Sequence, residues 1–223
     1  MSTHLLLTRH AETEWHAENR YAGGDSDIDL TPNGRVQAER LAGLDRIRPV
    51  HAVVCSPVRR AVETATPAAR HWGLEIEIEV GLREVSFGSA EGHRLAELEP
   101  AVAEAFRSDP VAHPFPGAED PHAAAARGAA TLDAVARRHP ERTVLVVAHN
   151  TVLRLILCTV LGLPLARYRT LFPRLDNVAL CEVVLRPGQP GPASLLGLNI
   201  PLPPLFTSAS PTASAASTPR RHP

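Results

Sequence analysis

The fold of this chain is decided by a stretch near its beginning, Leu5-Leu6-Leu7-Thr8-Arg9-His10-Ala11-Glu12-Thr13. A short apolar run bounded by polar residues is typical of a buried β-strand. Arg9 and His10 stand together where this strand should end. Because open α/β sheets bind ligands at the carboxyl ends of their strands, we expect both residues to face a crevice. Arg grips oxyanions through paired hydrogen bonds, and a neutral imidazole is a nucleophile at physiological pH.

Outward from this stretch, predicted strands alternate with predicted helices. We expect further strands over 51–55, 75–80, 143–148, 178–185 and 194–200, and helices from 31 onward and over 56–71, 95–106, 121–139 and 151–161. This order predicts an α/β fold, a doubly wound and mostly parallel sheet with helices on both faces. The last two strands are expected to form a C-terminal edge hairpin. We expect one catalytic domain over 1–200 and a disordered tail, rich in Pro, Ser, Thr and Ala, over 201–223.

Composition excludes several classes of protein. Hydrophobic residues make up 44% of the chain, charged residues 21%, and the net charge is −1. An ordinary globular protein of this charge has no general affinity for nucleic acid or anionic membranes. No signal peptide and no apolar run long enough to span a membrane is evident. Three scattered Cys residues predict buried thiols in a reducing cytoplasm, and argue against a disulfide framework or a zinc site.

Residues suited to catalysis or anion binding follow each of the four predicted parallel strands. Arg9 and His10 follow the first, residues 56–60 the second, Glu84 the third and His149 the fourth. The carboxyl ends of parallel strands face the same way, so these groups are expected to share one rim. The alternative is that Arg9 and His10 are merely solvated residues at a strand end. Two His, two Arg and a carboxylate on one rim favour a functional site.

The residues of this rim resemble those of a known family. Thr8-Arg9-His10-Ala11-Glu12-Thr13 is similar to the Arg-His-Gly-Glu signature of the histidine phosphatase superfamily, the phosphoglycerate mutase-like enzymes. Further similarity lies at Trp15, 19–23, 29–31, Gly34, 56–61, 64–65, 82–84, Gly88, 91–92 and 147–149. These motifs follow the family's order over roughly residues 5 to 200.

The resemblance implies a role for each matching residue. His10 corresponds to the nucleophile that becomes phosphorylated, Glu84 to the proton donor and His149 to the second pocket histidine. Arg9 and Arg60 correspond to the two arginines that grip phosphate. Arg59, by contrast, is expected to be a solvated helix charge. The resemblance implies no cofactor and no metal, because arginines and a second histidine surround the phosphate with donors.

Phosphoryl transfer sets further conditions on these residues, since it depends on in-line positioning and electrostatic stabilisation. His10 must be neutral, which requires its other ring nitrogen to donate, and we expect a backbone carbonyl as acceptor. Glu84 must be protonated to supply the leaving alkoxide, and ionised to activate water. The helix entered at Asn150 is expected to point its amino end at the phosphate.

The sequence departs from the family pattern at three positions. Ala11 and Asn150 stand where Gly is frequent, which is harmless unless the backbone there needs a positive φ. His16 stands where the family usually has Asn in contact with phosphate or nucleophile. Two alternatives are open: His16 donates to phosphate as the amide does, or it has turned to the surface. We therefore count Arg9, Arg60, His16 and Asn150 as the candidate phosphate ligands.

The sequence favours a metal-independent phosphatase of a small phosphomonoester, such as a sugar or cyclitol phosphate, working through a phosphohistidine. A cofactor-dependent phosphoglycerate mutase is the first alternative. The segment 92–149 has no Lys and few Arg to hold a carboxylate, and Ala22 lacks the hydroxyl that mutases favour there. An inactive phosphate-binding module is the second alternative. Specificity is expected in 93–120 and the 21–26 loop, with Phe115 in an apolar wall.

Overall fold

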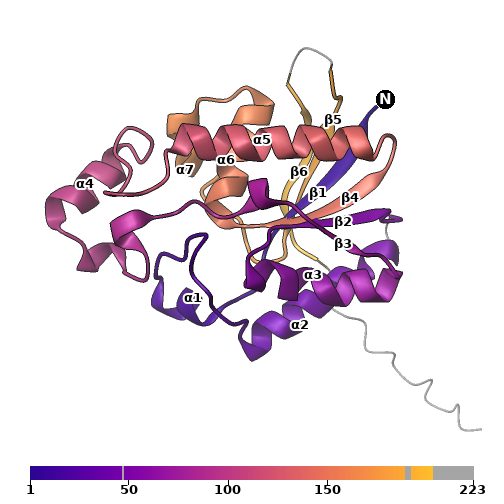
Figure 1. The fold of residues 1–223 in the computed structure, drawn as a ribbon, viewed down its shortest axis with the longest axis horizontal. Coiled ribbons are helices and arrows are strands. Elements are labelled where there is room, and N and C mark those ends of the chain that lie inside the picture. Colours follow the sequence, from indigo (N-terminus) through magenta and orange to yellow (C-terminus); the bar gives the residue numbers. More distant parts are fainter. Residues whose placement is uncertain (47, 189–191, 203–223) are drawn as a thin grey trace, which may run out of the picture.

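The computed structural model describes residues 1–46, 48–188 and 192–202. These residues form a six-stranded sheet in the order β3-β2-β4-β1-β5-β6 (Figure 1). The strands are β1 (Thr3–Arg9), β2 (Ala52–Cys55), β3 (Ile76–Ile78), β4 (Thr143–Ala148), β5 (Leu180–Leu185) and β6 (Ser194–Ile200). The first four are parallel, and β5 and β6 form an antiparallel hairpin at one edge. The predicted α/β fold is confirmed, including the edge hairpin.

The centre of the sheet is formed by β1 and β4, which pair in parallel from His4 with Thr143 to Arg9 with Ala148. Every residue of β4 is buried. Uninterrupted apolar runs are expected where helices cover both faces of a parallel sheet, and the side chains of β1 and β4 point into two separate cores. The pairing of β1 with β4 brings Arg9 and His149, the residue after β4, to the same rim.

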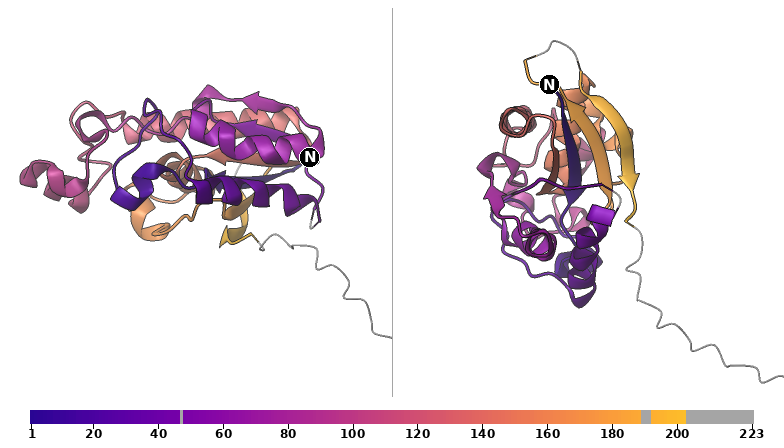
Figure 2. Two further views of the ribbon diagram at one scale, coloured as in Figure 1. Left: turned by 90° about the horizontal axis from the view of Figure 1, so that it is seen from below. Right: turned by 90° about the vertical axis from the view of Figure 1, so that its right-hand side faces the viewer.

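Helices cover both faces of this sheet (Figure 2). On one face lie α2 (Pro32–Arg40) and α3 (Arg59–Trp72), and on the other α5 (Pro121–Arg138) and α6 (Asn150–Leu161). Three shorter helices are α1 (Glu14–Glu18), α4 (Pro100–Ser108) and α7 (Tyr168–Leu171). In Figures 1 and 2, α4 stands out beyond the end of the sheet rather than on either face.

Two predicted elements differ from the structure. The helix expected over 95–106 is a short 3₁₀ turn, Leu95–Glu97, followed by α4. Pro100 explains the break, because proline lacks the N–H and clashes with the preceding turn, so it begins α4. The strand expected over 75–80 shrinks to β3, which pairs only with β2 at the edge of the sheet and leaves Ile78 and Val80 exposed.

The remaining predictions concern the cysteines and the C-terminus. Cys55, Cys158 and Cys181 are free and buried, as predicted. Leu202 is 5% exposed and packs in the core beside α2 and α3. The rest of the predicted tail, 203–223, lies outside the described residues. No helix in the described ranges is long and apolar enough to cross a membrane.

Candidate active site

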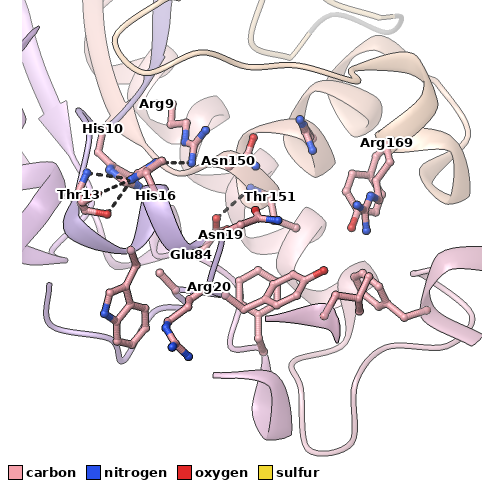
Figure 3. Close-up of a pocket in the computed structure, with 18 residues that line it drawn as sticks. Arg9, His10, Thr13, His16, Asn19, Arg20, Glu84, Asn150, Thr151 and Arg169 are labelled. Carbon is pink, nitrogen blue, oxygen red and sulfur yellow. Dashed lines mark hydrogen bonds between the residues drawn. The ribbon is translucent and has the colours of Figure 1, made fainter. Parts of the chain in front are cut away.

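The predicted rim encloses a cavity of about 350 Å³ (Figure 3). Five of the predicted site residues line it: Arg9, His10, His16, Glu84 and Asn150. Arg60 and His149 are fully buried and contact or approach His10. All seven candidate residues therefore meet, although they come from β1, α1, α3, the loop after β3 and the start of α6. Arg59 instead pairs with Glu63 and Asp29 on the surface, as predicted.

The imidazole of His10 is held in one orientation. Its Nδ1 lies 2.8 Å from the carbonyl oxygen of Ala11, so Nδ1 carries the proton and donates to the backbone, as predicted. His10 is 4% exposed, and burial, then the charge of Arg60, lowers its pKa well below the usual value. Nε2 consequently keeps its lone pair at neutral pH. The backbone of Ala11 has no positive φ, so the missing glycine costs nothing here.

Arg60 is an anchor as well as a candidate phosphate ligand. Its guanidinium donates to the carbonyl oxygens of Ala22, Gly23 and Ser26, at 3.2, 3.0 and 2.9 Å. Only its Nε–H faces His10, at 3.2 Å from Nε2. Arg60 therefore shapes the 22–26 loop and offers one donor at His10 Nε2.

His149 stands beside His10, with ring centroids 5.2 Å apart. Its Nε2 lies 2.7 Å from the Ser56 hydroxyl, which also accepts from the backbone N–H of Val58. If the Ser56 hydroxyl donates to Nε2, the ring proton of His149 is on Nδ1. His149 Nδ1 is buried and has no hydrogen-bond partner. Burial and Arg60 lower the pKa of His149 well below its usual value.

Glu84 is held by three backbone donors. Its Oε1 accepts from the N–H groups of Val85 and Val152, at 3.0 and 2.8 Å, and its Oε2 accepts from Thr151 at 2.9 Å. The carboxyl is 5% exposed, and burial raises its pKa against the opposing effect of these donors. A carboxyl that is easy to protonate yet rigidly aimed suits a general acid.

The same contacts correct one expectation about α6. Its amino end was expected to point at the phosphate, but the N–H groups of Thr151 and Val152 donate to Glu84. Helix N-termini attract any anion, and here a carboxylate of the chain reaches them. Among the residues that α6 presents to the cavity is Asn150, whose Oδ1 is buried without a hydrogen-bond partner.

His16 faces the cavity, so it has not turned to the surface. Its Nε2 lies 2.6 Å from Arg9 Nη2 and 3.2 Å from Asn177 Nδ2. Because Arg has only N–H donors, His16 Nε2 must accept. Burial and the charge of Arg9 lower the pKa of His16 to about 4, so the ring is neutral. His16 thus orients Arg9 and does not copy the donor role of an asparagine.

Sequence reasoning missed two residues that hold the site in place. The amide of Asn177 donates to the carbonyl oxygen of His10 at 2.7 Å. The guanidinium of Arg127, on α5, donates to the carbonyl oxygens of Gly81 and Arg83 at 2.8 and 2.9 Å, and so fixes the loop that carries Glu84. Arg127 is itself held by Glu119. Neither residue stands in a motif, and only chain folding brings it to its partner.

An aromatic wall closes one side of the cavity. Tyr21, Phe87 and Phe106 line it, whereas Phe115, expected in the wall, does not. Phe115 is 2% exposed and stacks on Phe106, with centroids 3.9 Å apart. It therefore lies behind the wall, packed against Phe106 of α4.

The fold is α/β, and the cavity places the buried imidazole of His10 among arginine side chains. Comparison with known proteins identifies the family of this chain. The model of the histidine phosphatase superfamily, branch 1, matches residues 5–196. A putative phosphoserine phosphatase 2 of Hydrogenobacter thermophilus is 33% identical over 182 residues, covering 80% of this chain and 88% of that protein.

Solved structures give the same family. A mycobacterial glucosyl-3-phosphoglycerate phosphatase superposes with a TM-score of 0.80 at 25% identity, covering 90% of this chain and all of that one. A phosphoserine phosphatase of Entamoeba histolytica, solved with phosphoserine, has a TM-score of 0.77 at 28% identity, covering 88% and 96%. The chain belongs to the histidine phosphatase superfamily, and it is a phosphatase of small phosphoesters.

Proposed function

We propose that this protein hydrolyses a small phosphomonoester through a phosphohistidine on His10, without a metal or cofactor. The observation that carries the proposal is the state of His10. Its Nδ1 proton is committed to Ala11, and Nε2 keeps its lone pair beside Arg60. An imidazole in this state is a nucleophile aimed at the cavity.

In the first step, His10 Nε2 attacks phosphorus and the bond from phosphorus to the ester oxygen breaks. Glu84 gives its proton to the departing alkoxide, so the alcohol leaves neutral. Arg9, the Nε–H of Arg60 and His149 Nδ1–H bear on the three equatorial oxygens, where charge gathers. Burial lowers the pKa of Arg9 only to about 10, so it remains a cation at neutral pH.

In the second step, water attacks the phosphorus of the phosphohistidine. The ionised Glu84 takes a proton from this water, the N–P bond breaks, and inorganic phosphate leaves. His10 returns to its neutral form with its Nδ1–H still bonded to Ala11. Glu84 ends protonated and ready for the next ester, so every proton is accounted for.

Trapping of the intermediate tests the proposal. Wild-type protein mixed with a ³²P-labelled aryl phosphate and quenched within milliseconds in base should carry label that is stable to base and lost in acid. His10→Ala should lose both label and turnover, and His51→Ala, at the opposite end of β2, should lose neither. Turnover by His10→Ala, or activity abolished by a chelator, would contradict the mechanism.

A mutase activity is the competing function. The cavity does contain basic side chains that could hold a carboxylate. The span 92–149 supplies no basic side chain to the cavity, but Arg154 and Arg169 line it from α6 and α7. The phosphatase assignment is supported by the named relatives. Offering 3-phosphoglycerate with catalytic 2,3-bisphosphoglycerate decides between the two: we expect phosphate release, and rapid isomerisation would contradict it. The cytoplasmic location stays a prediction.

A further inference from the structure

The segment that joins α7 to β5 crosses the end of β1 at the active site. We call its four residues, 175–178, the connector. The amide of Asn177 donates to the carbonyl oxygen of His10 at 2.7 Å, and the backbone N–H of Val178 donates to the carbonyl oxygen of Arg9 at 2.9 Å. The connector therefore holds the backbone of both candidate site residues directly.

The connector also sets the direction of the Arg9 side chain. Arg9 Nη1 donates to the carbonyl oxygen of Leu175 at 3.2 Å, and Nη2 donates to His16 Nε2 at 2.6 Å. His16 Nε2 lies in turn 3.2 Å from the amide nitrogen of Asn177. A guanidinium group is planar and rigid, so holding two of its nitrogens fixes the whole group. The connector, and not β1 alone, thus determines where Arg9 points in the cavity.

The backbone of the connector is strained. Val178 has a φ of 54°, in the left-handed region. This region is uncommon for any residue with a Cβ, and a β-branched residue found there is a genuine outlier. Such a conformation persists only where surrounding contacts enforce it, and outliers of this kind cluster at active sites. The connector therefore depends on contacts that keep it in this conformation.

Asn199, near the end of β6, supplies such a contact. Its Oδ1 accepts from the backbone N–H of Asp176 at 2.7 Å, and its Nδ2 donates to Asp176 Oδ2 at 3.1 Å. Asn199 itself has a φ of 52°, and the register of β6 against β5 shifts between Gly197 and Ile200. A β-bulge re-aims a side chain, and Asn is among the few residues other than Gly that tolerate left-handed backbone. The irregularity thus turns the Asn199 amide towards the connector.

The alternative is that this contact only anchors the last strand. However, β6 contributes little to the core: none of its residues is among the buried hydrophobic residues in the described part of the chain, and Leu196 is 57% exposed. Neither Asn199 nor Asp176 lines the cavity. Their hydrogen bonds instead fix the backbone directly before Asn177, the residue that holds His10. This placement favours a role in the active site.

We propose that Asn199 is a positioning residue for phosphoryl transfer: by fixing Asp176 it holds the connector against Arg9 and His10. The inference rests on the proposed phosphatase activity, and it extends control of that activity to a side chain of the last strand. A small displacement of reacting groups costs a large part of the rate. Because the phosphoryl group is common to all esters, a loosened connector should slow every ester alike.

Asn199→Gly separates the role of the side chain from that of the backbone. Glycine adopts the left-handed conformation without strain, so the variant loses both hydrogen bonds but can keep the bulge. Its kcat should fall about fivefold or more for alkyl and aryl phosphates alike, with the ratios between esters unchanged. Ser194→Ala, which removes an exposed hydrogen bond with Arg186 on the same strand, should keep kcat within about twofold. Wild-type kcat in Asn199→Gly would overturn the proposal.

Exchange of the two side chains tests whether this contact is the cause. When Asp176→Asn is combined with Asn199→Asp, the carboxylate can accept from the backbone N–H at position 176 and from the amide beside it, so both hydrogen bonds form again. The double variant should recover most of the kcat that Asn199→Gly loses. Asn199→Asp alone sets two carboxylates against each other and should be at least as slow as Asn199→Gly. A double variant no faster than Asn199→Asp would overturn the proposal.

Vanadate binding separates a positioning role from a structural one. Titration calorimetry with orthovanadate, which imitates the transferred phosphoryl group, gives a dissociation constant and a stoichiometry. Displaced Arg9 and His10 should raise the dissociation constant of Asn199→Gly about fivefold or more at unchanged stoichiometry. A variant that is merely less folded would lose stoichiometry at an unchanged dissociation constant, and this result would overturn the proposal.

The same titration separates this inference from the proposed activity. If no phosphoester is hydrolysed, the phosphatase mechanism fails, and vanadate binding still measures the effect of Asn199 on the site. Weaker binding by Asn199→Gly, recovered in the double variant, would support the positioning role on its own. Equal dissociation constants, or no binding to either protein, would overturn it.

Discussion

The two ends of the cavity are built in different ways. The end at which we propose that phosphate binds, the phosphate end, is made by residues at strand ends, with His10 and Glu84 at 4% and 5% exposure and Arg60 fully buried. The far end is made by side chains from short helices, loops and α6, among them Tyr21, Phe106 and the exposed Arg169. At the first end, hydrogen bonds from the backbone and from neighbouring side chains hold His10, Arg60 and Glu84 in place. The second end presents cationic and aromatic side chains where the alcohol part of an ester, which differs between substrates, would lie.

This difference predicts how substitutions behave. Changes at the phosphate end should lower turnover of every ester, because all esters share the phosphoryl group. Changes at the far end should alter the ratio between esters, because only their alcohol parts reach it. A far-end substitution that lowers turnover of every ester equally, or a phosphate-end substitution that changes only the ratio between esters, would contradict this difference.

Glu84→Gln should have the largest effect. An amide offers no proton to an alkoxide, so turnover of alkyl phosphates should fall by about 10²–10⁴-fold. An aryl oxide leaves without a proton, and its release should fall much less. Steady-state kinetics over a series of esters with different leaving groups measures this difference. Glu91→Gln is not a suitable control, because Glu91 accepts hydrogen bonds from Gly23 and Ser26 in the same part of the structure. Equal losses for alkyl and aryl esters would remove Glu84 from the role of acid.

Asn177→Ala should have the next largest effect. It deletes the 2.7 Å bond to the His10 carbonyl and the contact with His16, which together hold His10 and Arg9. Losing about 1.4 kcal/mol of orientation would lower kcat about tenfold for aryl and alkyl esters alike. Asn33→Ala removes an exposed amide on α2 and is the control. A change in KM alone, or in substrate ratios, would contradict a positioning role.

His16→Asn should keep activity within about tenfold, since an amide oxygen can also accept from Arg9, while His16→Ala should lose more. The same variant tests stability against pH. The folded-state pKa of His16 is about 4, below its unfolded value, so stability is full above pH 6.5 and is lost as pH falls towards 4. His10 and His149 act in the same direction.

Urea unfolding of wild type and His16→Asn between pH 7 and pH 5 measures this slope. Below pH 6.5 the variant should lose up to about 1.4 kcal/mol less unfolding free energy per pH unit, the value for one proton. Glu84 opposes the trend in both proteins, because burial raises its pKa. Parallel slopes for the two proteins would show that His16 takes up no proton on unfolding.

Phe106→Leu should have the smallest effect on chemistry. It removes the ring under Arg169 and next to the cavity, so ratios between esters with large and small alcohols should change a few-fold, with little change in turnover of a small aryl phosphate. Phe115→Leu is the control, because that ring packs behind the wall and should alter stability and not ratios. Changed ratios in Phe115→Leu alone would relocate the wall.

The sequence by itself determined the sheet and the phosphate end. Apolar runs specify buried strands, and Arg9, His10, Glu84 and His149 follow such runs directly, so their convergence on one rim is a consequence of parallel pairing. Local signals of this kind also specified the helices, except where Pro100 interrupts the segment 95–106. Even the acceptor for His10 Nδ1 is its neighbour Ala11.

Only the tertiary structure decided what surrounds that core. Asn177 is 167 residues from His10, and Arg127 is 46 residues from Gly81. Arg154 is an ordinary charge in an apolar helix until α6 packs with the cavity on that face. The tertiary structure also brings the amino end of α6 to Glu84 and the ring of His16 to Arg9. These contacts depend on packing between distant segments, and no periodicity or motif records which distant partner a polar side chain will meet.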